Sequence, residues 1–253
     1  MLYYLYDGSF EGFLTCVFDV YYRKETPDRI ANKKTFIPLF TETHPVMSDK
    51  DKAVRVLDGL KKKISKSAID MLYYCLLSEL PDIESVLLRY IQKAFASSIP
   101  IEVNFADDDV LALSKLYKKV SNERIRMLQF VRFQKTSDGM YFAVMNPMYN
   151  VLPICADFFQ DRYADQQWLI YDTRRHFGLF YDLKKTEMVR FEHPPVNLKT
   201  GKISSIHQDD YEKAFQALWK DYLEAITIQA RKNLRLQRQF MPKRFWKYLT
   251  EKS

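Results

Sequence analysis

The sequence is short of the residues that mark disordered, disulfide-bonded or membrane-spanning chains. Only 6 glycines and 10 prolines occur among 253 residues, too few for a low-complexity chain. Cys16, Cys75 and Cys155 are far apart and odd in number, so we expect neither a disulfide framework nor a zinc knuckle. No apolar run approaches the ~18 residues of a membrane span, and the first residues lack the basic region of a signal peptide. These absences favour a folded, cytoplasmic protein without a membrane partner.

Sequence motifs that would identify a catalysed reaction are absent as well. The sequence contains no phosphate-binding loop, no GxSxG or HExxH, no kinase signature and no paired histidines. Asp157, Asp161 and Asp165 would share a helical face, but Arg162 lies among them, so a solvated acidic face is favoured over a metal site. We therefore expect no metal and no cofactor, and the motifs leave open whether the protein is an enzyme.

What the sequence does contain is a positive charge concentrated near its end. The net charge is +7; from residue 225 onward there are eight basic residues and one acid, which leaves 31 of each sign in the first 224 residues (39 − 8 and 32 − 1). We call residues 231–248, RKNLRLQRQFMPKRFWKY, the basic tail. An anionic partner would be attracted mainly to it. The cations that we expect to contact phosphates are Arg231, Lys232, Arg235, Arg238, Lys243, Arg244 and Lys247.

Aromatic residues are interleaved with these cations, and Trp246 is the candidate for stacking on a base. On a continuous helix Arg231, Arg235 and Arg238 would lie on one face, and Pro242 would end that helix. The alternative is that Trp246 and Tyr248 pack on the core while the cations are merely solvated.

A second candidate site is the segment WLIYDTRRHFGLFYD, residues 168–182, which reads as strand, turn and strand. Asp172 and His176 in the turn could form an acid–base pair, with Asp7 as a further carboxylate, and Arg174 and Arg175 could bind phosphate. The alternative is a polar hairpin turn in which the carboxylate of Asp172 bonds its own backbone.

The patterns predict an α+β fold in two parts, residues 1–120 and 121–253, which could also form one compact domain. The first part would begin with a strand, an Asp-Gly turn and a helix that is capped by Ser9. It would continue as a block of helices at 51–64, 67–80, 81–95 and 107–123. Residues 35–40 are a possible edge strand. The second part would hold a hairpin-rich antiparallel or mixed sheet, beginning with strands at 126–134 and 140–146. A loop at 193–205 would lead to a long C-terminal helix starting at 208–210, with its apolar face buried.

Four segments, residues 6–21, 126–133, 150–182 and 229–249, together resemble an uncharacterised bacterial family of DNA-metabolism proteins. Its members are typically encoded beside a candidate radical-SAM protein of DNA modification or repair, and the domain also occurs fused to uracil-DNA-glycosylase-like domains. The resemblance implies a role in DNA repair or modification but supplies no catalytic residues. In many relatives the residues just before the second segment include a histidine next to the arginine. In this sequence that place reads NERIRM, with Ile125 before Arg126. Without a CxxxCxxC cluster, this chain would be the companion and not the radical-SAM enzyme.

Three functions remain open. The first is an accessory protein of DNA repair or modification that binds nucleic acid through the basic tail and works with a radical-SAM partner. That the nucleic acid is DNA is what the resemblance implies. The second is a glycosylase-like or nuclease-like enzyme with its site at the 172–176 turn. The third is a protein-interaction scaffold without DNA contact.

Overall fold

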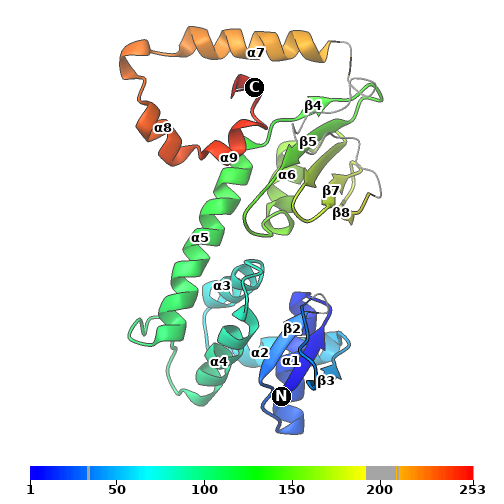
Figure 1. Cartoon of the computed structure of the whole chain (residues 1–253), viewed down its shortest axis with the longest axis vertical. Helices are drawn as coiled ribbons and strands as arrows, with labels where there is room; N and C mark the ends of the chain where they lie inside the picture. Colours follow the sequence, from blue (N-terminus) through cyan, green and yellow to red (C-terminus); the bar gives the residue numbers. More distant parts are fainter. Residues whose placement is uncertain (33–34, 192–208, 210, 253) are drawn as a thin grey trace. The chain divides into compact units, whose positions relative to one another are not determined.

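The computed structural model describes residues 1–32, 35–191, 209 and 211–252, and it divides the chain into two compact units (Figure 1). The first unit is Met1–Ser121 and the second is Asn122–Ser253. Both units combine helices with a sheet, so the α+β class is confirmed. No helix in the described part of the chain is long and apolar enough to cross a bilayer.

The first unit is built around a three-stranded parallel sheet. Strand β1 (Leu2–Tyr6) lies between β2 (Arg29–Asn32) and β3 (Glu42–Pro45). Helix α1 (Phe10–Arg23) connects β1 to β2, as a parallel pair requires a crossover. Ser9 ends the turn and caps α1, because its side chain accepts a hydrogen bond from the backbone N–H of Gly12 at 2.9 Å.

Four further helices complete the first unit: α2 (Lys50–Lys61), α3 (Lys66–Leu76), α4 (Ile83–Ala96) and the beginning of α5 (Asp108–Phe130). Their apolar faces bury Leu60, Leu72, Leu87 and Val110. This burial supplies the main driving force for packing the helices together.

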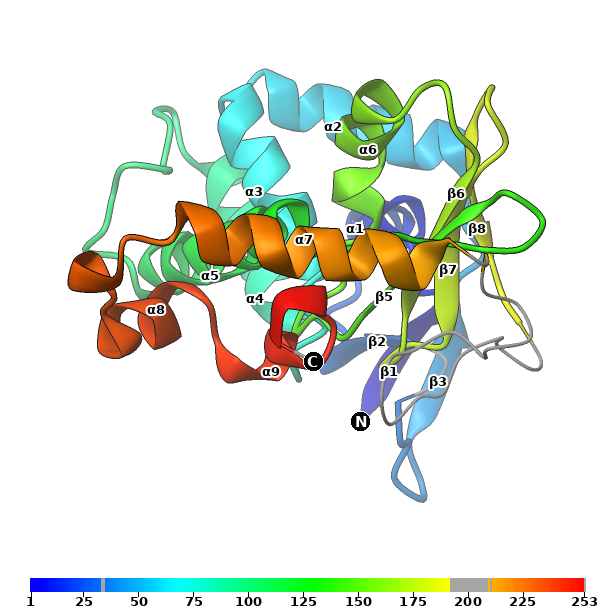
Figure 2. The same cartoon turned by 90° about the horizontal axis from the view of Figure 1, so that it is seen from above.

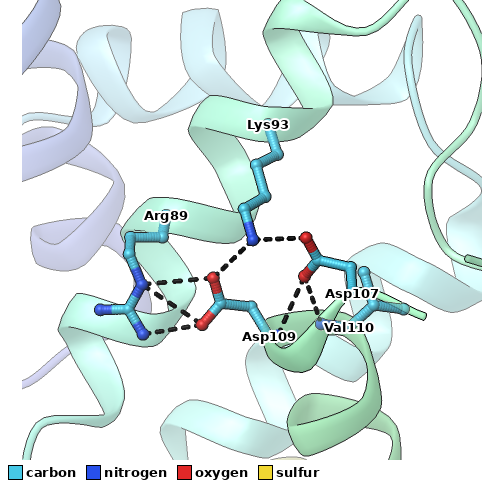
Figure 3. Close-up of polar contacts among 5 residues, drawn as sticks. All are labelled: Arg89, Lys93, Asp107, Asp109 and Val110. Atoms are coloured by element: carbon cyan, nitrogen blue, oxygen red, sulfur yellow. Dashed lines mark hydrogen bonds and ion pairs between the residues drawn. The ribbon is translucent and has the colours of Figure 1, made fainter. Parts of the chain in front are cut away.

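An ion-pair cluster joins α4 to the start of α5 (Figure 3). Arg89 contacts Asp109 at 2.7 Å, and Lys93 contacts both Asp107 and Asp109, at 2.5 and 2.8 Å. Asp107 also caps α5 by accepting hydrogen bonds from the backbone N–H groups of Asp109 and Val110. The same carboxylates therefore start α5 and hold it against α4.

The second unit contains a five-stranded mixed sheet of order β4-β5-β6-β7-β8. Its strands are β4 (Gln134–Lys135), β5 (Tyr141–Met145), β6 (Trp168–Asp172), β7 (Phe177–Tyr181) and β8 (Thr186–Val189). Strands β5 and β6 are parallel, and the 3-10 turn η1 (Pro153–Cys155) and α6 (Ala156–Arg162) form the crossover between them. The other pairs are antiparallel, and Gly139, with φ of 86°, makes the β4–β5 turn.

After the sheet, the second unit continues as an arch of short helices that returns to α5 (Figure 1). It consists of α7 (Glu212–Ile226), η3 (Gln229–Arg231), α8 (Leu234–Phe240), α9 (Lys243–Trp246) and η4 (Thr250–Lys252). Seen from above, α7 runs past the C-terminal segment (Figure 2), and the two are in contact.

Three details of the predicted fold are wrong. Residues 35–40 form no strand, and the irregular region around them contains β2 and β3. Residues 126–130 continue α5, because Val120, Glu123, Met127 and Phe130 keep one buried helical face beyond the expected end. The predicted long C-terminal helix stops at Ile226, and its apolar side chains are exposed. The predicted loop at 193–205 lies outside the described residues.

Candidate nucleic-acid interface

The first half of the basic tail presents its cations to solvent. Arg231, Lys232, Arg235 and Arg238 are all exposed, and none forms an ion pair with a carboxylate of the described residues. Arg231, Arg235 and Arg238 do not share the one continuous helix that their spacing predicted. Arg231 ends η3, Lys232 is extended, and Asn233 starts α8 by accepting a hydrogen bond from Leu236 N at 3.0 Å. This half of the tail is therefore a segment of uncompensated positive charge.

The second half of the basic tail is anchored in the second unit by its apolar side chains. Phe245 and Leu249 are 0% exposed, and the ring of Phe245 lies 5.4 Å from that of Phe130. Trp246 is half-buried; its indole N–H donates to the carbonyl of Met241 at 2.9 Å. Burial of these aromatics fixes where the tail runs, while Lys243 and Lys247 remain exposed.

Glu123 is a buried carboxylate around which the second half of the tail is organised. It is 1% exposed, accepts the backbone N–H of Met148 at 2.7 Å and is paired with Arg244. Arg126 approaches the same carboxylate at 3.4 Å. Arg244 is thus neutralised within the fold, unlike the cations of α8.

The same contacts connect the basic tail to the 172–176 turn. The carbonyl of Met148 accepts hydrogen bonds from Arg174 at 3.0 Å and Arg175 at 3.2 Å. The hydroxyls of Thr173 and Tyr248 lie 3.3 Å apart. The structure therefore places two of the predicted regions side by side in the second unit.

Within the turn, Asp172 is occupied by its own neighbours. The carboxylate is 1% exposed, accepts the backbone N–H of Arg174 at 2.8 Å and of Arg175 at 3.2 Å, and pairs with the Arg175 guanidinium at 2.9 Å. Burial raises the pKa of Asp172, although Arg175 opposes the shift. His176 is exposed and adopts a positive φ of 57°. The arrangement is that of a hydrogen-bonded hairpin turn in which Asp172 positions the backbone.

Two other residues singled out from the sequence take no part in these contacts. Ile125 is 47% exposed on α5, beside the Arg126 that pairs with Glu123. Asp7 belongs to the first unit, where it accepts hydrogen bonds from Ser9 and Ser48. Asp157, Asp161 and Asp165 are all exposed, and no cluster of metal-ligating side chains occurs among the described residues.

An aromatic pocket in the second unit was not predicted. Its lining comes from the residues directly after α5, from β4, β5 and β6, from the segment after α6, and from α7 and η4. No short motif could have revealed it, because the lining residues lie in five separate stretches of the sequence, 131–135, 141, 163–168, 212–219 and 250. The strand expected at 126–134 also obscured this pocket, because α5 continues to Phe130 and Val131, Arg132 and Phe133 follow its end into the lining.

All three cysteines are buried free thiols, and burial raises their pKa. Burial suppresses the thiolate form, which is the nucleophile. The cysteines therefore belong to the core and not to a reactive site.

Comparison with known proteins places the chain in one family. No curated protein and no solved structure matches it. A family profile matches residues 81–251, from the loop before α4 to η4, and includes the basic tail, the 172–176 turn and the aromatic pocket. Because the match covers more than half of the sequence, the chain belongs to the family defined by the domain of unknown function DUF4130.

Proposed function

We propose that this protein binds nucleic acid through the exposed cations of the basic tail. The observation that carries the proposal is that Arg231, Lys232, Arg235 and Arg238 are exposed and unpaired with any described carboxylate. Charges of one sign that are left uncompensated are electrostatically unfavourable in the free protein. A polyanion would relieve their repulsion and release its own counterions.

The anchored half of the tail supports the same proposal by giving the cations a fixed position. Phe245 and Leu249 hold the end of the segment in the core, and Arg244 is held by Glu123. Lys243 and Lys247 extend the basic surface between these anchors. Cations that are fixed in place lose less conformational entropy on binding than those of a free tail.

The resemblance to DNA-metabolism proteins supports DNA as the nucleic acid and an accessory role in repair or modification in the cytoplasm. On this proposal a radical-SAM protein is the partner. The exposed apolar side chains of α7, among them Phe215, Leu218 and Tyr222, are compatible with contact to another macromolecule. An enzymatic site at the 172–176 turn finds less support, because the Asp172 carboxylate is buried and fully engaged.

The test is the salt dependence of binding to a labelled DNA oligonucleotide, measured by fluorescence anisotropy. Each lost phosphate contact reduces the slope of log affinity against log salt by about one. Changing Arg231, Arg235 and Arg238 to Ala should reduce the slope by about two to three and weaken binding at least about tenfold at low salt.

The matched control removes the same net charge from the first unit by changing Lys62, Lys118 and Lys119 to Ala. These lysines are exposed and form no ion pair with the described residues. The control should leave the slope unchanged. Equal effects of the two triple variants would contradict a specific role for the tail. Nuclease-resistant co-purification with a radical-SAM protein, together with no DNA binding, would favour the scaffold function instead.

A further inference from the structure

The second unit contains a pocket of about 530 Å³ beneath α7. This volume lies within the range of ~300–1,000 Å³ that is usual for small-molecule sites. Six of the thirteen described lining residues are aromatic. The rings come from Phe133, Tyr141, Tyr163, Trp168, Phe215 and Trp219.

The rings of the inner wall hold one another in place. Phe133 packs edge-on against Tyr163, with ring centroids 5.2 Å apart, and lies 6.3 Å from Trp168. Trp168 is itself stacked on Tyr181, at 5.5 Å. A wall of rings fixed in this way suits a flat, aromatic ligand, since stacking requires a rigid partner surface.

Two hydrogen-bond donors of the lining have no partner. The indole N–H of Trp168 and the Nε–H of Arg132 are both buried and form no hydrogen bond with any described residue. Trp168 is 0% exposed, so its N–H cannot be satisfied by bulk water. An unpartnered buried donor costs about 1–3 kcal/mol. Both atoms are also closed off from the open volume of the pocket, so a ligand acceptor would reach them only after the side chains around them move.

The charged groups of the lining already have partners among the described residues. Arg132 pairs with Glu251 at 2.8 Å, Lys135 pairs with Asp209 at 3.4 Å, and Glu212 accepts the backbone N–H of Lys135. Gln166 and Gln216 add amide groups that can both donate and accept. The pocket therefore suits an uncharged ring with hydrogen-bonding edges better than an anion.

We propose that this pocket binds one unpaired nucleobase of a nucleic-acid strand. The inference rests on the proposed function, because the helical arch that continues into the basic tail also forms one wall of the pocket. A base inside a duplex cannot reach such a pocket, so the ligand is single-stranded or has one base flipped out. The phosphates bind the exposed cations, and the pocket binds the base.

The experiment compares two labelled decamers of equal charge, one of thymidylate and one of stable abasic tetrahydrofuran units. Stacking of one base on aromatic side chains should make the thymidylate decamer bind at least about fivefold more tightly. The two decamers should show the same salt slope, because both carry the same phosphates.

Variants of α7 locate the effect. Phe215 and Leu218 are both 62% exposed, but only Phe215 lines the pocket. Phe215→Ala should remove most of the preference for thymidylate, and Leu218→Ala should keep it. Trp219→Ala, which removes a partly exposed ring of the lining, should also reduce the preference while thermal melting confirms that the variant is folded. Phe240→Ala removes an exposed ring of α8 and should have no effect.

Equal binding of the two decamers would overturn the base pocket and leave the proposed function intact. A preference that depends on Phe240 and not on Phe215 would also overturn it. If neither decamer binds, the proposed function fails and the base pocket fails with it.

Discussion

Two arginines of the basic tail show that surroundings, and not residue type, decide what a cation does. The guanidinium of Arg244 is paired with Glu123, a carboxylate that is 1% exposed. Arg238, six residues earlier, is exposed and makes no ion pair with the described residues. The sequence presents both as members of one basic run, but only Arg238 is free to meet a phosphate.

The contrast predicts that two equivalent truncations differ in their effect on stability. Arg244→Ala leaves the buried carboxylate of Glu123 with the backbone N–H of Met148 and with Arg126, at 3.4 Å, as its remaining cationic partner among the described residues. An uncompensated buried charge is strongly destabilising, so we expect a loss of about 2 kcal/mol or more in the free energy of unfolding. Arg238→Ala should change it by less than about 0.5 kcal/mol. Urea denaturation of the two variants measures the difference.

Glu123→Gln provides the control for the loss of the ion pair. Gln keeps an acceptor for Met148 N and removes the charge that Arg244 neutralises, so Arg244→Ala should be less costly in that background. Equal stability of the Arg244→Ala and Arg238→Ala proteins would show that the Glu123 contact does not stabilise the fold.

At the scale of elements, the joint between β1 and α1 depends on the absence of a side chain at Gly12. A Cβ at this position would lie 2.4 Å from Asp7 Oδ1 and 2.7 Å from Ser48 Oγ. Asp7 cannot easily move away, because Ser9 N, Ser9 Oγ and Ser48 Oγ all donate to its carboxylate. The turn, the helix start and the segment after β3 are thereby packed closely together.

Gly12→Ala should therefore destabilise the protein, although Ala is the better helix former by about 1 kcal/mol. We expect a net loss of about 1–3 kcal/mol from the forced contact. An Asp7→Ala background removes the nearest of the obstructing atoms and the acceptor that holds Ser48 Oγ, so the same substitution should cost less. A double-mutant cycle by urea denaturation gives the coupling free energy. Additive effects would mean that Asp7 does not restrict this position.

Elements encoded by neighbouring residues could be predicted from the sequence. Ser9 marks the start of α1, and Asp138-Gly139 marks the turn between β4 and β5, because a cap and a tight turn each depend on a few adjacent side chains. Strands β2 and β3 could not be predicted in the same way. Each has four residues and becomes a strand by pairing with β1, which is distant in the sequence.

The candidate site was predictable to a similar extent. The exposed cations of α8 follow from charge alone. The pairing of Arg244 with Glu123 spans 121 residues, and the lining of the aromatic pocket comes from five separate stretches of the sequence, so neither leaves a local pattern. The apolar periodicity of α7 predicts a buried face, yet Phe215 and Leu218 are exposed. Periodicity reports that a face is apolar and does not say what covers it.

At the scale of the whole molecule, both units depend on ionised carboxylates. In the first unit, hydrogen bonds from Arg89 to Asp109 and from Lys93 to Asp107 lower the pKa of these carboxyl groups. In the second unit burial acts to raise the pKa of Glu251, but the hydrogen bond and the charge of Arg132, a backbone hydrogen bond and the hydrogen bond from Trp219 together lower it. A carboxyl with a lowered folded-state pKa contributes stability above its unfolded pKa, and that stability is lost as the pH falls through the folded pKa.

The protein should therefore lose stability as the pH falls below about 4, near the unfolded pKa of aspartate and glutamate. Protonation also removes the negative charges that balance the basic residues, so self-repulsion adds to the effect across the whole chain. Asp109→Asn isolates the contribution of the ion-pair cluster in Figure 3. Because Arg89 and Lys93 are about half exposed, we expect a loss of only about 1 kcal/mol at neutral pH.

This loss should diminish in acid, because the wild-type carboxyl is then protonated and no longer differs in charge from the amide. Asp108→Asn is the matched control: Asp108 lies beside Asp109 in the first turn of α5, is exposed, and forms no ion pair with the described residues. Urea denaturation of the wild type and both variants at neutral pH and near pH 3 gives the comparison. A stability difference between Asp109→Asn and the wild type that stays constant with pH would show that the ionised form of Asp109 does not stabilise the junction of α4 and α5.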